Sequence, residues 1–307
     1  MAACQQLVPD DERVEVMQQV SERLFDYIDE FAGSMAAEFV IERDRWVTSA
    51  AAAREEAVRA LIEGHDHVPS AIPDYDLTRA HVGLLLWFDP VRSDADTAEL
   101  QRAALEVLRY WDCTHTLVVP IGRARLWAWG SRRSLPDRLR VGAHKPDRPD
   151  VAMAYGSPGA GLAGFRRTHQ EALAAERIHK PAQPEYRWAT SYAQVEIAAL
   201  LTDDLPAAAA FLRRHLGPLA ADTAPARDLR RTLLAYLEHG NSPHLAAQRL
   251  HVSRNTVNYR IKRVEELLGP YWRERSHPLH TALVVLRDIG DHILWHEPDS
   301  DQPAPQP

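Results

Sequence analysis

The chain has 307 residues, 45% hydrophobic and 26% charged, with a formal net charge of −7, which fits a globular protein of two or three domains. Its two cysteines, Cys4 and Cys113, show no metal-binding spacing and no disulfide framework, as expected for a reducing cytoplasm. The sequence holds no apolar run of 18 residues and no leader pattern, so we expect neither membrane insertion nor secretion.

Residues 1–76 are expected to form a helical N-terminal region. Between Asp11 and Gly64 apolar residues recur every three or four positions, which predicts an amphipathic pair of helices, the second over about 49–63. Such a stripe usually packs against a partner helix, in the same chain or in a second one. The simpler interpretation is that these helices pack together in a bundle and bind no ligand. Residues 1–10 are expected to fray, and 65–76 to form a linker.

The hydrophobic period changes in residues 77–190. The apolar run Ala80–Phe88 predicts a buried strand, and further strands are expected over 116–120, 126–130, 150–155 and 186–190. Helical patterns cover 95–111 and 165–178. This order predicts a ferredoxin-like α+β domain, with the helices on one face of a mixed sheet.

Three stretches of this domain, LVVPIGR at 117–123, GSPG at 156–159 and GLAGFRRTHQEALAA at 161–175, resemble the degenerate GGDEF-like domain of PucR/CdaR-type bacterial regulators. A working cyclase needs an acidic hairpin loop and paired metal-binding carboxylates. The hairpin turn at 121–125 has no acid, and Asp89 stands alone, so no catalytic residue and no metal are expected.

Gly159, Gly161 and Gly164 match the G-x-G-x-x-G pattern of dinucleotide sites. In those sites the first glycine follows the strand directly, whereas residues 156–158 intervene here. A structural turn and no cofactor are therefore expected. The fifteen histidines are scattered without a ligand set and predict no metal site.

Residues 191–225 are rich in alanine and leucine and predict a helical connector, followed by a scaffold helix over 227–239. Two helices joined at 251–253 are then expected in 242–269. Ser242 and Ser253 are suited to cap them, and Gly269 followed by Pro270 to end the second. A last helix is expected over 276–293 and a disordered tail over 297–307.

The second of these helices has an apolar stripe of Val257, Ile261 and Val264. The other side of this helix carries side chains that can contact DNA. Amides and a lysine are suited to hydrogen bonds with base edges, and side chains at the start and on the flank of the helix are suited to contacts with phosphates. The candidate DNA-binding residues are Arg254, Asn255, Thr256, Asn258, Tyr259, Lys262 and Arg263. The alternative is an ordinary αα-hairpin with a solvated charged face.

Charge is distributed unevenly along the chain. Residues 226–290 contain eleven Arg or Lys and six Asp or Glu, a net of +5, which leaves −12 for the rest of a chain that totals −7. A locally positive segment is what phosphate binding requires.

Residues 226–296 resemble the C-terminal DNA-binding domain of the PucR/CdaR-type regulators, through LAYLEHG at 234–240, VSRNTV at 252–257 and YR at 259–260. Two positions depart from the family pattern: His251 stands where glycine is common, and Asn258 where arginine is frequent.

The resemblance implies a multidomain, cytoplasmic bacterial transcriptional regulator that is not an enzyme. It would bind double-stranded DNA as a homodimer or higher oligomer, under the control of its upstream domains or of a small-molecule effector. The alternatives are an enzyme built on the middle domain, a nucleotide cyclase or a dinucleotide-dependent enzyme, and a partner-switching scaffold that does not bind DNA.

Overall fold

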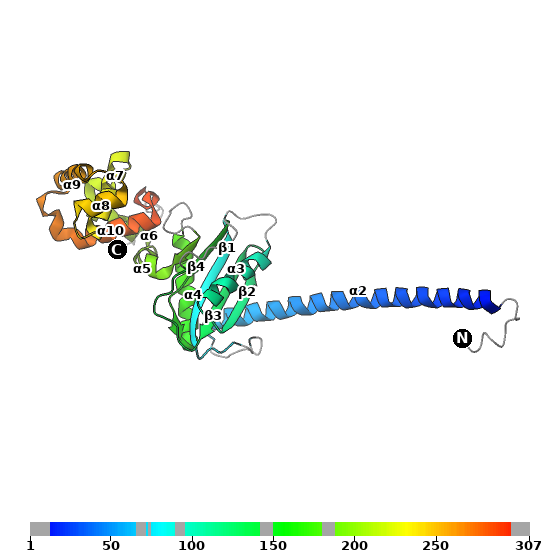
Figure 1. Ribbon diagram of the computed structural model, residues 1–307. Coiled ribbons are helices and arrows are strands. Elements are labelled where there is room, and N and C mark those ends of the chain that lie inside the picture. The colour runs from blue at the N-terminus through cyan, green and yellow to red at the C-terminus, as the bar shows by residue number, and fades with distance from the viewer. Residues whose placement is uncertain are drawn as a thin grey trace, which may run out of the picture. The chain divides into compact units, whose positions relative to one another are not determined.

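The computed structural model describes residues 13–65, 72, 75–89, 96–141, 150–179 and 188–295. The chain divides into two compact units, Met1–Pro73 and Asp74–Pro307 (Figure 1). The expected frayed start and disordered tail lie outside the described residues, as does most of the expected linker.

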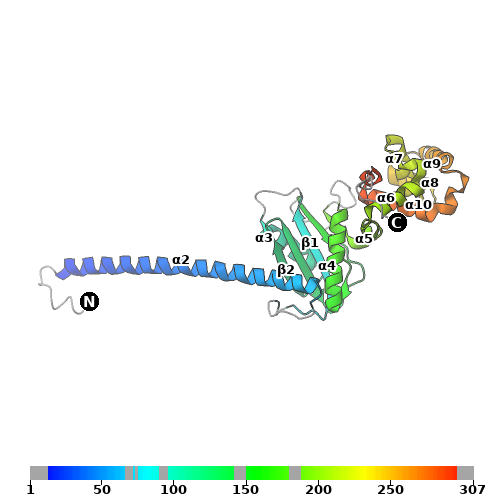
Figure 2. The ribbon, with the colours of Figure 1, turned by 180° about the vertical axis from the view of Figure 1, so that it is seen from behind.

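The first unit contains α2, Arg13–Ile62, a single helix of 50 residues (Figures 1 and 2). The expectation of two helices was wrong, because no proline or glycine interrupts residues 34–62 and the alanines from 50 onward favour helix. Its large apolar side chains from Leu24 to Phe39 are exposed. None of the described helices, α2 included, is long and apolar enough to cross a membrane.

The second unit begins with a mixed sheet of six strands, which confirms the predicted α+β middle region. The sheet order is β2-β3-β1-β4-β6, with β5 paired to β1, and only the β4–β6 pair is parallel. The strands are β1 (Ala80–Phe88), β2 (His115–Ile121), β3 (Arg125–Arg132), β4 (Val151–Tyr155), β5 (Gly159–Ala160) and β6 (Ala189–Ser191).

Two helices, α3 (Thr97–Tyr110) and α4 (Gly161–Ile178), cover opposite faces of this sheet. Even-numbered residues of β1, such as Leu84, join the apolar cluster that includes α3. The odd-numbered Gly83 instead meets α4, where its N–H donates to Thr168 Oγ1 at 2.8 Å. Since successive side chains of a strand point to opposite faces, the prediction that both helices share one face was wrong. The uninterrupted apolar sequence of β1 reflects burial on both sides.

The remainder is helical: α5 (Tyr192–Leu201), α6 (Leu205–Leu216), α7 (Ala224–Glu238), α8 (Pro243–Leu250), α9 (Arg254–Leu268) and α10 (Ser276–Ile289), with short 3₁₀ helices η1 (Gly217–Ala220), η2 (Pro270–Arg275) and η3 (Asp291–Trp295). The last α-helix ends earlier than predicted because Gly290 has a φ of +99°. One apolar cluster runs from the end of α4 through α5 to α10. The boundaries proposed at 190, 225 and 296 stay predictions.

Candidate nucleic-acid interface

Helices α8 and α9 form the predicted helix–turn–helix, and the predicted caps organise it. Ser242 precedes Pro243 and accepts a hydrogen bond from the Leu245 N–H at 3.4 Å. At the other end of α8, His251 has a φ of +54° and a ψ of +43°. This is the left-handed conformation that usually favours glycine. The chain reverses there and enters α9.

Helix α9 begins at a second cap and is held to the domain by its apolar stripe. Ser253 Oγ accepts the Thr256 N–H at 3.1 Å. Val257, Ile261 and Val264 are buried as predicted. Helices α7 and α8 both pack against α9, so the orientation of α9 within this domain is set by burial.

A long-range ion pair, which the sequence analysis did not predict, also fixes α9. Arg260 Nη2 donates to Asp228 Oδ2 of α7 at 2.7 Å, and its Nη1 donates to Thr232 Oγ1 at 3.1 Å. The only sequence signal is the position of Arg260, one helical turn after Val257 on the flank of the buried stripe. Arg260 therefore holds α9 to α7 on the buried side of α9.

The opposite face of α9 brings together the residues predicted to read bases. Asn255, Asn258, Tyr259 and Lys262 are all exposed, Tyr259 by 72%. Their spacing of three and four residues places them on one side of the helix. Within the described part of the chain, the side chains of these four residues form no hydrogen bond and no ion pair.

The three residues predicted to contact phosphate have different environments. Arg254 is exposed in the first turn of α9. Thr256 is half-buried, and its Oγ1 lies 2.8 Å from Ser253 Oγ, so it takes part in the cap. Arg263 is exposed but pairs with Glu266 at 2.6 Å. An exposed pair of this kind contributes at most about 1 kcal/mol, so a phosphate can compete for the guanidinium.

Two glycines of the G-x-G-x-x-G pattern in the middle domain lie where the backbone packs closely. A Cβ on Gly164 would lie 2.2 Å from the carbonyl carbon of Gly159, and a Cβ on Gly159 would lie 2.7 Å from Gly164 Cα. The two backbones meet where β5 enters α4. Among the described residues, no group of three or more His, Cys, Asp or Glu side chains could hold a metal ion.

Comparison with known proteins finds a matching family model for the C-terminal helices and another for the middle domain. Residues 229–285 match the family model of the PucR C-terminal helix-turn-helix domain, and residues 71–178 match that of the GGDEF-like domain. A curated protein of Thermomonospora curvata, described as an uncharacterized protein in the pkwA 5' region, is 47% identical over 70 residues. This match covers 23% of the chain and spans 37% of the relative's length.

Among solved structures, the chain matches the Regulator of Polyketide Synthase Expression from Bifidobacterium adolescentis at 20% identity, over 75% of this chain and 91% of that one. The TM-score of 0.35 is too low to show a common overall arrangement. The assignment therefore rests on the two domain matches. The chain carries a GGDEF-like domain and a PucR C-terminal helix-turn-helix domain, which is consistent with a PucR/CdaR-type regulator.

Proposed function

We propose that the chain is a DNA-binding transcriptional regulator that inserts α9 into the major groove. One observation carries this proposal: the exposed polar face of α9, built from the residue types that read base edges. In helix–turn–helix proteins the second helix reads the groove while the first crosses the backbone. Helices α8 and α9 have these two roles in our proposal.

The chemistry of the exposed face supports readout of sequence. Asn255 and Asn258 can each donate and accept in a bidentate pair with adenine, and Lys262 can donate to guanine acceptors. Tyr259, the most exposed large side chain of α9, has an O–H that donates and accepts.

The charges of the C-terminal domain support binding to the phosphate backbone. Residues 226–290 have a net charge of +5. Arg260 forms an ion pair with Asp228 of α7, whereas Arg254 and Lys262 have no ion pair with any described residue. Arg254 also stands where the first N–H groups of α9 favour an anion. We propose that Arg254, Arg263 and, less directly, Thr256 contact phosphates.

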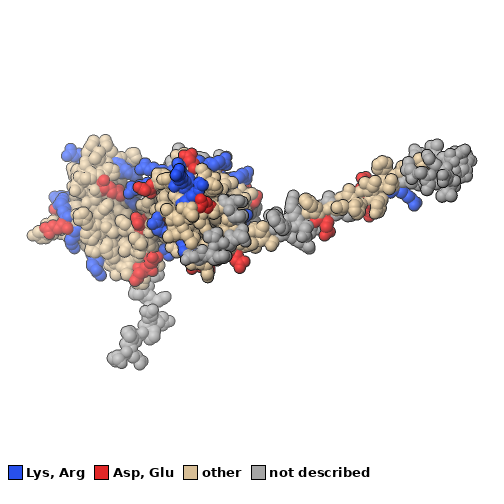
Figure 3. Space-filling view, turned by 90° about the horizontal axis from the view of Figure 1, so that it is seen from below, with Lys and Arg blue, Asp and Glu red and all other residues tan. Residues whose placement is uncertain are grey.

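We further propose that the chain binds DNA as a homodimer paired through α2. Leu24, Ile28, Phe31 and Met35 follow a 4-3-4 spacing, the seam of a two-stranded coiled coil, and each is 49–59% exposed. Figure 3 shows mainly uncharged side chains along the coloured part of this helix. Pairing would bury the seam and bring two α9 helices to one DNA site.

In this proposal the middle domain is regulatory and not catalytic. The turn between β2 and β3 consists of Gly122, Arg123 and Ala124 and has no carboxylate that could bind Mg²⁺. Incubation of the chain with GTP and Mg²⁺ should give no cyclic product, and turnover would contradict this part of the proposal.

The direct test is binding of the full chain to a random DNA pool, followed by sequencing of the retained fraction and titration at 50 and 200 mM salt. We expect an enriched motif and an affinity that falls with salt. The variant Asn255→Ala/Lys262→Ala should lose the enrichment. Arg59→Ala, which removes an exposed arginine paired with Glu55 in α2, is the control and should keep it. A pool without enrichment would contradict sequence-specific binding.

A further inference from the structure

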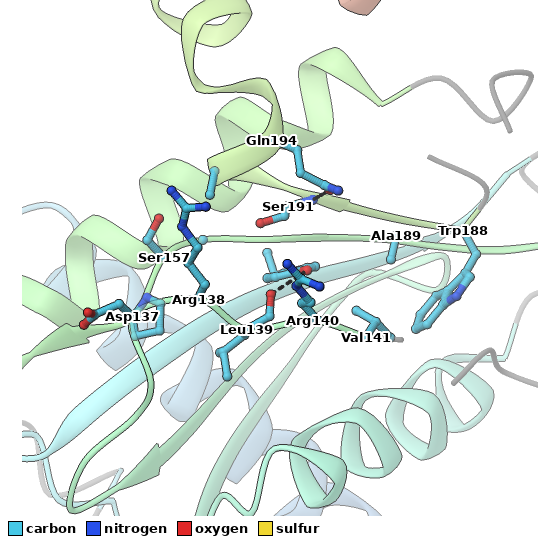
Figure 4. Close-up of a pocket in the computed structure, with 14 residues that line it drawn as sticks. Asp137, Arg138, Leu139, Arg140, Val141, Ser157, Trp188, Ala189, Ser191 and Gln194 are labelled. Carbon is cyan, nitrogen blue, oxygen red and sulfur yellow. Dashed lines mark hydrogen bonds between the residues drawn. The ribbon is translucent and has the colours of Figure 1, made fainter. Parts of the chain in front are cut away.

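A cavity of about 440 Å³ lies in the middle domain at the start of α5 (Figure 4). Three segments line it: 137–141 after β3, 155–158 after β4, and 188–194, which includes β6 and the first turn of α5. This volume is in the range of sites for small organic molecules. The hairpin turn at 121–125, where a cyclase would place its acidic loop, does not line it.

Two arginines give the cavity its charge. Arg138 and Arg140 lie on either side of Leu139 in the irregular segment that follows β3. Figure 4 shows both guanidinium groups on the side of the segment that faces Ser191 and Gln194. Neither guanidinium forms an ion pair or a hydrogen bond with a described residue.

The segment that carries these arginines is held in place. Trp111 Nε1 donates to the Arg140 carbonyl at 3.0 Å, and the Tyr155 hydroxyl donates to the Leu139 carbonyl at 3.3 Å. Both rings belong to the core of the domain, with their centroids 5.0 Å apart. The backbone that carries the two arginines is therefore anchored to the core of the domain, and both side chains extend from it as exposed groups.

The opposite wall adds a backbone donor. Ser191 and Gln194 form a reciprocal cap, in which the Ser191 N–H donates to Gln194 Oε1 at 3.3 Å. This cap leaves the N–H of Ala193, a residue that lines the cavity, without a partner inside the helix, at the positive end of α5. Asp137 is the one carboxylate among the lining residues, and Figure 4 places it at the edge of the site away from Trp188.

Apolar side chains complete the site. Val141, Tyr155 and Trp188 each line the cavity and are exposed by only 5–7%. An apolar floor beneath paired arginines suits a ligand with a carboxylate or phosphate at one end and an apolar body at the other. We infer that this cavity binds a small organic anion, held by Arg138, Arg140 and the first turn of α5.

The same helix connects the cavity to the DNA-binding domain. From α5, Val195, Ala198 and Ala199 are buried in the same apolar cluster as Leu279 and Leu283 of α10, and α5 packs directly against α10. A ligand that engages the first turn of α5 thus acts on a helix in contact with the scaffold of α8 and α9. This regulatory half of the inference rests on the proposed function, whereas anion binding does not.

Calorimetric titration of the full chain with benzoate, phthalate and AMP tests the site, with benzamide as the uncharged counterpart of benzoate. We expect saturable binding of at least one anion and none of benzamide. The variant Arg138→Gln/Arg140→Gln, which removes charge at nearly constant size, should weaken that binding at least tenfold. Arg133→Gln is the control, because Arg133 is exposed directly after β3, close in sequence to Arg138, and does not line the cavity.

Failure of all three anions to bind, or equal binding by the double variant, would overturn the site. DNA affinity is then measured with and without the bound anion. A change of at least threefold that the double variant loses supports the coupling, and an unchanged affinity overturns it. Anion binding by a chain that does not bind DNA at all would leave the site standing and refute the proposed function.

Discussion

His251 shows how a single residue can carry backbone strain within the candidate interface. Its left-handed conformation, with a φ of +54°, costs a non-glycine residue about 1–2 kcal/mol. Glycine removes this strain but loses about 0.5–1 kcal/mol through the greater freedom of its unfolded chain. We expect His251→Gly to raise the free energy of unfolding by up to about 1 kcal/mol, as measured by urea denaturation. A clear loss of stability would show that the imidazole has a structural role that its exposure does not suggest.

His81 is expected to make the middle domain sensitive to acid. Burial lowers the pKa of His81 below its ordinary value of 6.5. Its Nε2 lies 3.1 Å from the Leu77 carbonyl and its Nδ1 lies 3.0 Å from the Tyr75 hydroxyl. These partners suit a neutral ring that donates at Nε2 and accepts at Nδ1.

Because the pKa of His81 is lowered in the folded state, the unfolded chain binds more protons than the folded chain below about pH 6.5. The contribution of His81 to the free energy of unfolding is therefore complete above that pH and decreases as the pH falls through this range. Thermal unfolding at pH 7.5 and 5.5 should show this decrease. His81→Gln should be less stable at pH 7.5 and should lose less stability on acidification. An unchanged pH dependence in the variant would exclude His81 as the source.

At the scale of whole elements, the junction of β5 and α4 depends on a close approach of two backbones. The 2.2 Å contact that a Cβ on Gly164 would make is with backbone, which cannot move aside. Gly164→Ala should therefore destabilise the fold by about 1–3 kcal/mol, despite the better helix propensity of alanine.

Gly33 in α2 is the matched control for this change, because a Cβ there would meet nothing within 4 Å. Gly33→Ala should leave the fold intact and increase the helical signal. Circular dichroism melting of both variants compares the two sites. Equal effects would mean that the contact with Gly159 does not limit the size of residue 164.

Sequence patterns predicted the elements whose cause is local. Continuous apolar residues predicted β1, and Ser242, Ser253 and Gly269 correctly marked the ends of α8 and α9. Local patterns could not show the pairing of Arg260 with Asp228, 32 residues away, because the fold alone brings them together. The placement of α4 opposite α3 depends likewise on tertiary packing.

Within the candidate site, the helical periodicity of the α9 sequence predicted which residues are buried and which are exposed. It could not show that Thr256 would turn to Ser253 or that Arg263 would pair with Glu266, since both depend on side-chain rotamers. The cavity near Arg138 had no sequence signal, because its three lining segments are distant along the chain.

For the molecule as a whole, the proposed pairing through α2 predicts a dimer in solution. Ile28→Glu/Phe31→Glu places charges in the apolar seam and should produce a monomer in light scattering, with at least tenfold weaker DNA binding from the loss of the second half-site. Glu30 lies on the other side of α2, and Glu30→Ala should change neither property. A variant that remains dimeric would place the dimer contact elsewhere.

The division of labour on α9 is the central claim, and operator variants test it most directly. Affinity is measured for each single-base variant of the selected site, at two salt concentrations, with Asn255→Ala and Arg263→Ala. We expect Asn255→Ala to cost about 1–3 kcal/mol on the best site and to relax preference at one base pair. We expect Arg263→Ala to weaken all sites equally and to lower the salt slope by about one. Intact base preference in Asn255→Ala, together with altered preference in Arg263→Ala, would contradict the account.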